Sequence, residues 1–162
     1  MGVELACWAR ELPDALILGI ELYQPGIGSL FSKLVNEGIE NVRVIEAPAQ
    51  SVIGELPNSS VDEIRILFPD PWPKKRHHKR RLVQKEFICQ AKRVLVEGGR
   101  LQIATDWKPY ADWILSCIEE NTGFAKEGNY ILRTHFLLKQ KKLFTSYSYM
   151  HLFEIFMENL TL

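Results

Sequence analysis

Short apolar runs alternate along this chain with longer stretches in which apolar residues recur every three or four positions. The runs are typical of strands and the recurring stretches are typical of helices. A chain that alternates in this way is predicted to form an α/β domain, with a mostly parallel sheet that helices cover on both faces. Its 162 residues suit a single domain. The predicted strands lie at residues 15–21, 41–46, 64–68, 100–105 and 152–157.

Proline and glycine residues mark the ends of the predicted helices. Pro25 fits the first turn of a helix, and Gly38 is placed to end it. A later helical stripe is expected to end in a turn at Gly98-Gly99. The predicted helices lie at residues 3–11, 25–38, 50–56, 83–98 and 110–123.

The charge of the chain is balanced overall but locally uneven. Residues 74–81 contain six of the 20 Lys and Arg residues and no acid, which leaves 14 basic residues against 20 acidic ones elsewhere. The sequence therefore excludes a uniformly basic protein and indicates one concentrated basic site.

Composition argues against several classes of protein. No apolar run approaches the ~20 residues of a membrane-spanning helix, and no secretory signal precedes the first helix. The three cysteines form no CxxC pair, and we interpret them as buried apolar residues in a reducing, cytoplasmic protein. His77 and His78 lack the spacing of metal ligands, so no metal site is predicted.

Acidic residues lie at the carboxyl ends of three of the predicted strands, where ligands bind in open parallel sheets. They are Glu21, Asp70 and Asp106. Each also has a purely structural interpretation. Glu21 would simply end a strand, Asp70 would be a turn residue between prolines, and Asp106 would be the N-cap of the next helix.

The segment 68–74 reads Phe-Pro-Asp-Pro-Trp-Pro-Lys and has the densest chemical signal. Its three prolines restrict the backbone on both sides of Asp70, and a rigidly placed carboxylate suits a catalytic or binding group. Trp72 would either stack on a nucleic-acid base or cover the end of the sheet.

The basic block 74–81 suits phosphate binding that weakens with salt. A solvated helix start and a nuclear-localisation signal are the alternatives. Cations at a helix start oppose the helix dipole, which favours an anionic partner.

The chain resembles the bacterial tRNA (guanine-N7-)-methyltransferases on these residues, and the resemblance covers about residues 2–130. It implies a Rossmann-like, S-adenosylmethionine-dependent methyltransferase fold and methyl transfer to N7 of a variable-loop guanine in tRNA. We expect a monomer or a homodimer. The matching segments are 18–21 with 25–28, 68–74 with 78–81, and 104–107 with 109–111.

The resemblance also implies roles for individual residues. Asp70 would be catalytic, and it would bind the donor together with Glu21 and Gly2. The residues implied or inferred to contact tRNA are Lys74, Asp106, Arg76, Lys79 and Arg80, and the basic block as a whole, through Arg81, is expected to hold the RNA.

The chain also departs from the family pattern. Only Gly2 remains of the family's first strand and its glycine motif, Pro48 stands where the family has a donor-side Asp, and residues 137–162 diverge. A missing central strand would leave backbone groups unpaired on both neighbours, each costing about 1–3 kcal/mol. We therefore expect a truncated, poorly stable or inactive chain. The alternative function is that of a non-catalytic RNA-binding remnant.

Overall fold

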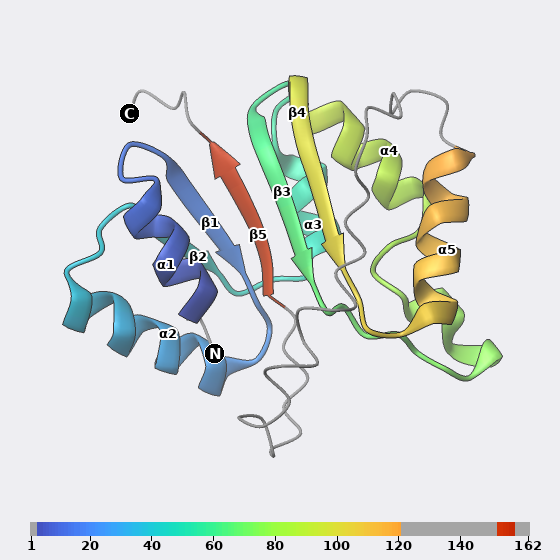
Figure 1. Ribbon diagram of the computed structural model, residues 1–162, viewed down its shortest axis with the longest axis horizontal. Helices are drawn as coiled ribbons and strands as arrows, with labels where there is room; N and C mark the ends of the chain where they lie inside the picture. Colours follow the sequence, from blue (N-terminus) through green and yellow to red (C-terminus); the bar gives the residue numbers. More distant parts are fainter. Residues whose placement is uncertain (1–2, 121–151, 158–162) are drawn as a thin grey trace.

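The computed structural model describes residues 3–120 and 152–157 as a layered α/β structure (Figure 1). None of the helices in these two ranges has the length and apolar character needed to cross a membrane. The elements in chain order are α1 (Val3–Glu11), β1 (Leu16–Ile20), α2 (Gln24–Glu37), β2 (Val42–Ile45), α3 (Ala49–Glu55), β3 (Val61–Leu67), the 3₁₀-helix η1 (Lys75–Arg80), α4 (Lys85–Val94), β4 (Leu95–Ala104), α5 (Lys108–Glu119) and β5 (Leu152–Met157).

The strands form one sheet in the order β2-β1-β5-β3-β4. β1 and β2 are parallel, as are β3 and β4, whereas β5 runs antiparallel to both of its neighbours. Four of the five strands therefore run in the same direction, which confirms the predicted α/β architecture with a mostly parallel sheet. The carboxyl ends of β1 and β3 lie at the lower edge of the sheet in Figure 1.

The expectation of a vacant central position was wrong. β5 lies between β1 and β3, and its residue Ile155 is in register with Leu18 on one side and Ile64 on the other. Backbone N–H and C=O groups in a sheet interior need partners, and an antiparallel strand supplies them as well as a parallel one. The sequence predicted this strand at residues 152–157 but gave no indication of its place in the sheet.

Helices cover both faces of the sheet. Successive side chains of β1 point to opposite faces and therefore pack into two separate cores. Ile17 packs with α1, α2 and Val42 of β2, in a core that includes Leu5, Ala6, Ala9, Leu30 and Leu34. Leu18 and Ile20 face the opposite core, which the buried residues of α3, α4 and α5 fill. The two cores fix the orientation of β1 and therefore of the residue that follows it.

Glycine positions test the predicted helix ends. Gly38 ends α2 in the left-handed conformation, with φ of 65°, and its N–H donates to the carbonyl of Val35. The predicted turn at Gly98-Gly99 was wrong, because α4 ends at Val94 and the chain continues directly into β4. Gly98, with φ of 78°, instead lies where the pairing of β3 with β4 shifts register.

Candidate functional site

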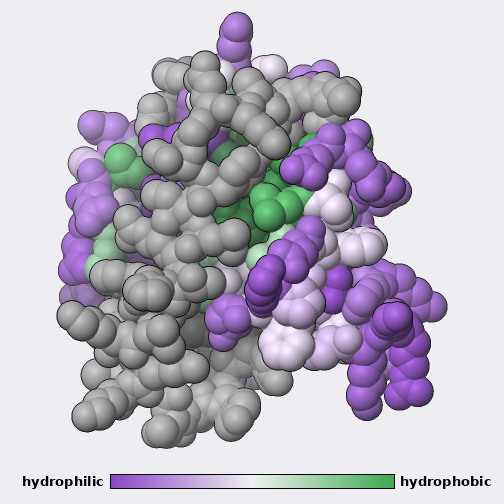
Figure 2. Space-filling model, turned by 45° about the vertical axis from the view of Figure 1, so that its right-hand side comes forward, coloured by the Kyte–Doolittle hydropathy of each residue, from purple (hydrophilic) through white to green (hydrophobic). Residues whose placement is uncertain are grey.

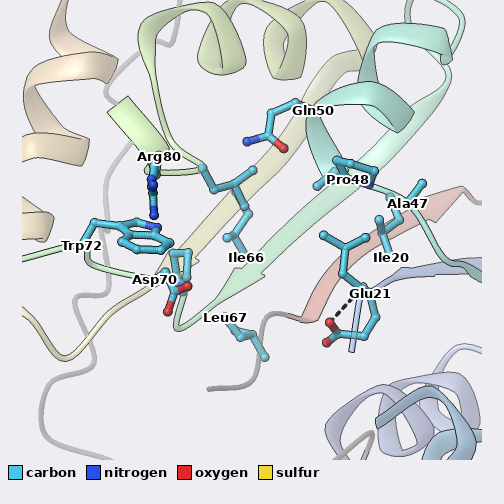
Figure 3. A pocket seen from close by; sticks show the side chains of 14 residues that line it. Ile20, Glu21, Ala47, Pro48, Gln50, Ile66, Leu67, Asp70, Trp72 and Arg80 are labelled. Atoms are coloured by element: carbon cyan, nitrogen blue, oxygen red, sulfur yellow. Dashed lines mark hydrogen bonds between the residues drawn. The ribbon is translucent and has the colours of Figure 1, made fainter. Parts of the chain in front are cut away.

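A cleft of about 190 Å³ lies at the carboxyl ends of β1 and β3 (Figure 3). The loop after β2 and the start of α3 close one side of it, and the segment after β3 closes the other. This is the edge where the topology of a parallel sheet places a ligand. Its polar lining residues are Glu21, Gln50, Asp70, Trp72 and Arg80, and its apolar ones include Ile20, Leu22, Ala47, Pro48 and Ile66.

Glu21 is fixed at the end of β1 with one carboxylate oxygen satisfied and the other left over. The side chain belongs to a residue that is only 4% exposed. Its Oε1 accepts hydrogen bonds from the backbone N–H groups of Leu22, at 2.7 Å, and Tyr23, at 2.8 Å. Its Oε2 is buried and has no hydrogen-bond partner among the described residues. A buried acceptor without a partner is rare, and one beside a cleft suits a ligand that donates hydrogen bonds.

Asp70 faces the same cleft from a loop whose backbone is constrained on both sides. Phe68 has φ of 50° and Trp72 has φ of 42°, a left-handed conformation that bulky residues seldom adopt. The prolines at 69 and 71 lie between these two residues, and Pro69 is buried. Unfavourable backbone geometry of this kind persists only where the surroundings enforce it, and it concentrates at functional sites. Asp70 is therefore held by the loop as well as by its prolines.

Arg81 attaches this loop to α5 and is not part of the exposed basic surface. It is 3% exposed, and its guanidinium carbon lies 4.9 Å from the ring centre of Tyr110 and 5.4 Å from that of Trp113. Its Nε donates a 2.9 Å hydrogen bond to the carbonyl of Pro71. Burial lowers the pKa of Arg81 and raises the pKa of Tyr110 to about 12. Arg81 was expected to hold RNA with the rest of the block, but it is buried and does not lie on the exposed surface that the other cations form.

The remaining cations of the basic block are exposed on η1 and the residue before it, namely Lys74, Lys75, Arg76, Lys79 and Arg80. η1 is separate from α4, which begins at Lys85 and has Glu86 in its first turn. The predicted unfavourable interaction of these cations with the dipole of an α-helix was therefore wrong, since they do not lie at the start of one. Arg80 lies over the ring of Trp72, at 5.1 Å, and so connects the basic turn to the cleft.

Comparison with known proteins assigns the chain to a family. The profile of the family described as "Putative methyltransferase" matches residues 1–147. The chain belongs to this methyltransferase family. The resemblance inferred from the sequence is confirmed by curated relatives, each called tRNA (guanine-N(7)-)-methyltransferase.

The similarity to three of these methyltransferases is substantial but partial. The Nitrosococcus oceani protein is 48% identical over 124 residues, which are 76% of this chain and 52% of the relative. The Marinobacter nauticus protein is 42% identical over 134 residues, 80% of this chain and 56% of the relative. A Pseudomonas aeruginosa protein is 40% identical over 137 residues, 82% and 56% respectively. The chain spans about half the length of the curated relatives it matches.

The cleft of this methyltransferase-family chain brings together some of the predicted site residues and not others. Glu21, Asp70 and Arg80 line it, and so does Pro48, the residue that departs from the family pattern. Lys74, Arg76 and Lys79 lie on the basic surface and do not line the cleft. Gly2 lies outside the described residues.

Asp106 is exposed and does not line the cleft. Its interpretation as an N-cap was wrong, because α5 begins at Lys108 with Trp107 at the N-cap position and no side-chain cap. Thr105 helps to hold this junction, because its Oγ1 accepts a 3.3 Å hydrogen bond from the N–H of Trp107.

Sequence reasoning missed the contribution of the loop after β2. Ala47 and Gln50 line the cleft, although no motif marks them. The signal that was present is topological, since loops after adjacent parallel strands meet at one edge of the sheet. In the part of the chain that the structure describes, no group of three or more His, Cys, Asp and Glu side chains could hold a metal ion.

Proposed function

We propose that this chain forms the donor-binding and catalytic part of a tRNA (guanine-N7-)-methyltransferase, which transfers a methyl group from S-adenosylmethionine to N7 of a variable-loop guanine. The observation that carries the proposal is the buried Oε2 of Glu21, which lacks a partner among the described residues and borders the cleft that Asp70 also lines. The names of the relatives support the choice of reaction and substrate.

The residues of the cleft fit a nucleoside-containing methyl donor. A ribose hydroxyl would donate to Glu21 Oε2, the contact that a carboxylate at the end of a strand makes in nucleotide-binding sheets. The apolar side chains of Ile20, Leu22 and Pro48 offer a surface for a flat base. The volume of about 190 Å³ is below the ~300–1,000 Å³ of typical ligand sites, so these residues enclose only part of such a donor. S-adenosylmethionine, when bound, supplies a methyl group on a positively charged sulfur.

Asp70 is the catalytic residue of the proposal, and its role is electrostatic. Guanine N7 has a lone pair and no proton, so the reaction does not require a base to deprotonate the acceptor. The methylated base carries a positive charge, and a fixed carboxylate beside the path of transfer stabilises that charge as it moves. The constrained backbone from Phe68 to Trp72 holds the carboxylate in place before substrate binds, which lowers the cost of orientation.

The exposed cations of η1 are assigned to the tRNA backbone. Lys75, Arg76 and Lys79 lie on the surface beside the cleft, and Arg80 extends from the same turn to its edge. Such a surface binds phosphates without reading sequence and positions the RNA relative to the donor. The resemblance assigns Lys74 and Asp106 to substrate contacts. Lys74 directly precedes η1, and Asp106 lies two residues before the start of α5.

Isothermal titration calorimetry with S-adenosylmethionine tests the proposal directly. We expect the wild-type chain to give a saturable binding heat with S-adenosylmethionine, and Glu21→Gln to bind it more weakly than wild type. Binding of a tRNA transcript is measured in parallel by filter binding. A chain that binds tRNA but gives no heat with the donor would refute the enzyme and support the RNA-binding remnant instead.

A further inference from the structure

A second hollow lies beside the proposed donor cleft, between η1 and the start of α5. Its volume is about 470 Å³, within the range of small-molecule sites. It shares the proline-rich segment with the cleft, since Trp72 lines the cleft and Pro73 lines the hollow. The side chains that give it its chemical character are Lys75, His78, Arg81, Trp107, Asp112 and Trp113.

One wall of the hollow is aromatic and fixed. The Nε1 of Trp113 donates a 2.9 Å hydrogen bond to the carbonyl of Val83, and Arg81 stacks against the same ring. The ring of His78 lies 6.1 Å from that of Trp113, at an angle of 54° between the two planes. These contacts hold Trp113 rigidly, so that little ordering is needed when a ligand arrives.

The other aromatic residue of the hollow is exposed. Trp107 is 42% exposed, although a tryptophan gains more than almost any other residue from burial. Its backbone N–H donates a 3.3 Å hydrogen bond to Oγ1 of Thr105, which helps to hold the backbone at the start of α5. An exposed indole beside cations is an arrangement that proteins use to stack single-stranded bases.

The charge of the hollow favours an anion. Lys75 is exposed and Arg81 is buried against the aromatic wall. Asp112 is the acid of the lining, and it is paired with Lys108 at 3.0 and 3.1 Å, which offsets its charge. Figure 2, which brings this side of the molecule forward, shows strongly hydrophilic side chains projecting at the lower right beside a surface of intermediate hydropathy.

We propose that this hollow is a second RNA subsite, in which an unpaired base stacks on Trp107 while Lys75 neutralises the phosphate next to that base. The inference rests on the proposed function only for the choice of RNA as the ligand. Because the hollow and the cleft share one loop, a nucleotide held here would keep the neighbouring RNA close to Asp70. Trp107 is therefore a substrate-binding residue and not a catalytic one.

The probe is a fluorescein-labelled single-stranded RNA hexamer of mixed sequence, compared with an abasic hexamer of the same length and charge. Binding is measured by fluorescence anisotropy. We expect Trp107→Ala to weaken binding of the base-containing hexamer by about 5- to 100-fold and Trp107→Phe to weaken it by less. Neither change should alter binding of the abasic hexamer. Lys75→Gln should weaken both probes alike and lower the slope of log K against log salt by about 0.7.

Phe31→Ala is the matched control, because Phe31 is also an exposed aromatic residue, 49% exposed, but lies on α2. It should leave both affinities unchanged. The subsite would be refuted if Trp107→Ala bound the base-containing hexamer as tightly as wild type, or lost affinity equally for both probes. Calorimetry with S-adenosylmethionine on Trp107→Ala should match wild type. The wild-type chain could give no heat with S-adenosylmethionine while Trp107→Ala still weakens binding of the base-containing hexamer alone. That result would refute the proposed enzyme and leave the subsite supported.

Discussion

The guanidinium of Arg81 donates from Nε to the carbonyl of Pro71, at 2.9 Å, while its flat face lies against Tyr110. This contact joins the loop that carries Asp70 to α5. We expect Arg81→Ala to lower the free energy of unfolding by about 2–3 kcal/mol, since a hydrogen bond from a charged group and its aromatic packing are both lost. Urea denaturation measures the change. Lys79→Ala, an exposed residue of the same turn, should change stability by less than about 0.5 kcal/mol.

Glu21→Gln separates donor binding from folding. The amide oxygen can still accept from Leu22 and Tyr23, but an NH₂ group replaces the acceptor Oε2. We expect affinity for S-adenosylmethionine to fall by about 10- to 100-fold, the value of a hydrogen bond to a charged group. Calorimetry measures this affinity. Glu46→Gln changes an exposed carboxylate outside the cleft lining and should behave as wild type.

Asp70→Asn tests the electrostatic role without changing the size of the side chain. Methyl transfer to tRNA should slow by about 10²-fold or more, because the compensating negative charge is removed. The affinity for tRNA should change far less. The measurement is incorporation of radiolabelled methyl groups into a tRNA transcript under single-turnover conditions. A variant that methylates as fast as wild type would exclude Asp70 from the reaction.

The buried hydroxyl of Tyr110 predicts a loss of stability at high pH. Burial raises its pKa to about 12, and its oxygen accepts a 3.2 Å hydrogen bond from the N–H of Val83. An unfolded tyrosine ionises near pH ~10, so between about pH 10 and 12 only the unfolded state releases this proton. Stability should therefore fall as pH rises through that window, by roughly 2–3 kcal/mol from this group.

Urea denaturation at a series of pH values measures this effect. Tyr110→Phe is the control, since it removes the hydroxyl and should show a shallower decline above pH ~10. Equal slopes for the two proteins would show that another group causes the decline. Below about pH 10 the two proteins should differ by a constant amount, which reflects the lost hydrogen bond to Val83.

A proline in β5 tests its central position. Ile155 is in register with Leu18 and Ile64, so Ile155→Pro removes an N–H from the middle of the sheet. We expect a destabilisation of at least about 1–3 kcal/mol for the acceptor left unpaired. Hydrogen exchange should show faster exchange of amides in both β1 and β3. Unchanged protection of these strands would place Leu152–Met157 elsewhere in solution.

The sequence predicted the order of the elements because its signals are local. Gly38 ends α2 as its left-handed preference requires, and the strand over residues 152–157 is where its apolar run predicts it. The partners of that strand depend on backbone groups more than 80 residues away, for which periodicity carries no information. The helix end predicted at Gly98 was wrong for the same reason. The positive φ of Gly98 accompanies the shift in register between β3 and β4, which the local sequence does not reveal.

The candidate site was predicted to a similar extent. Glu21 and Asp70 could be found because they follow strands whose ends share an edge of the sheet. The burial of Arg81 could not be found, because its neighbours in sequence are exposed cations and its partners, Tyr110 and Trp113, come from α5. Gln50 carried no motif, and only the packing of α3 against the sheet brings it to the cleft.

β5 also governs when the cleft can form. Glu21 follows β1 and Asp70 follows β3, and these two strands pair with β5 and not with each other. On the ribosome, both carboxylates emerge long before Leu152–Met157, while the spacing between them is still unset. A nascent chain should therefore gain affinity for the proposed methyl donor only once residue 157 has left the exit tunnel, because β5 sets the spacing between the two carboxylates.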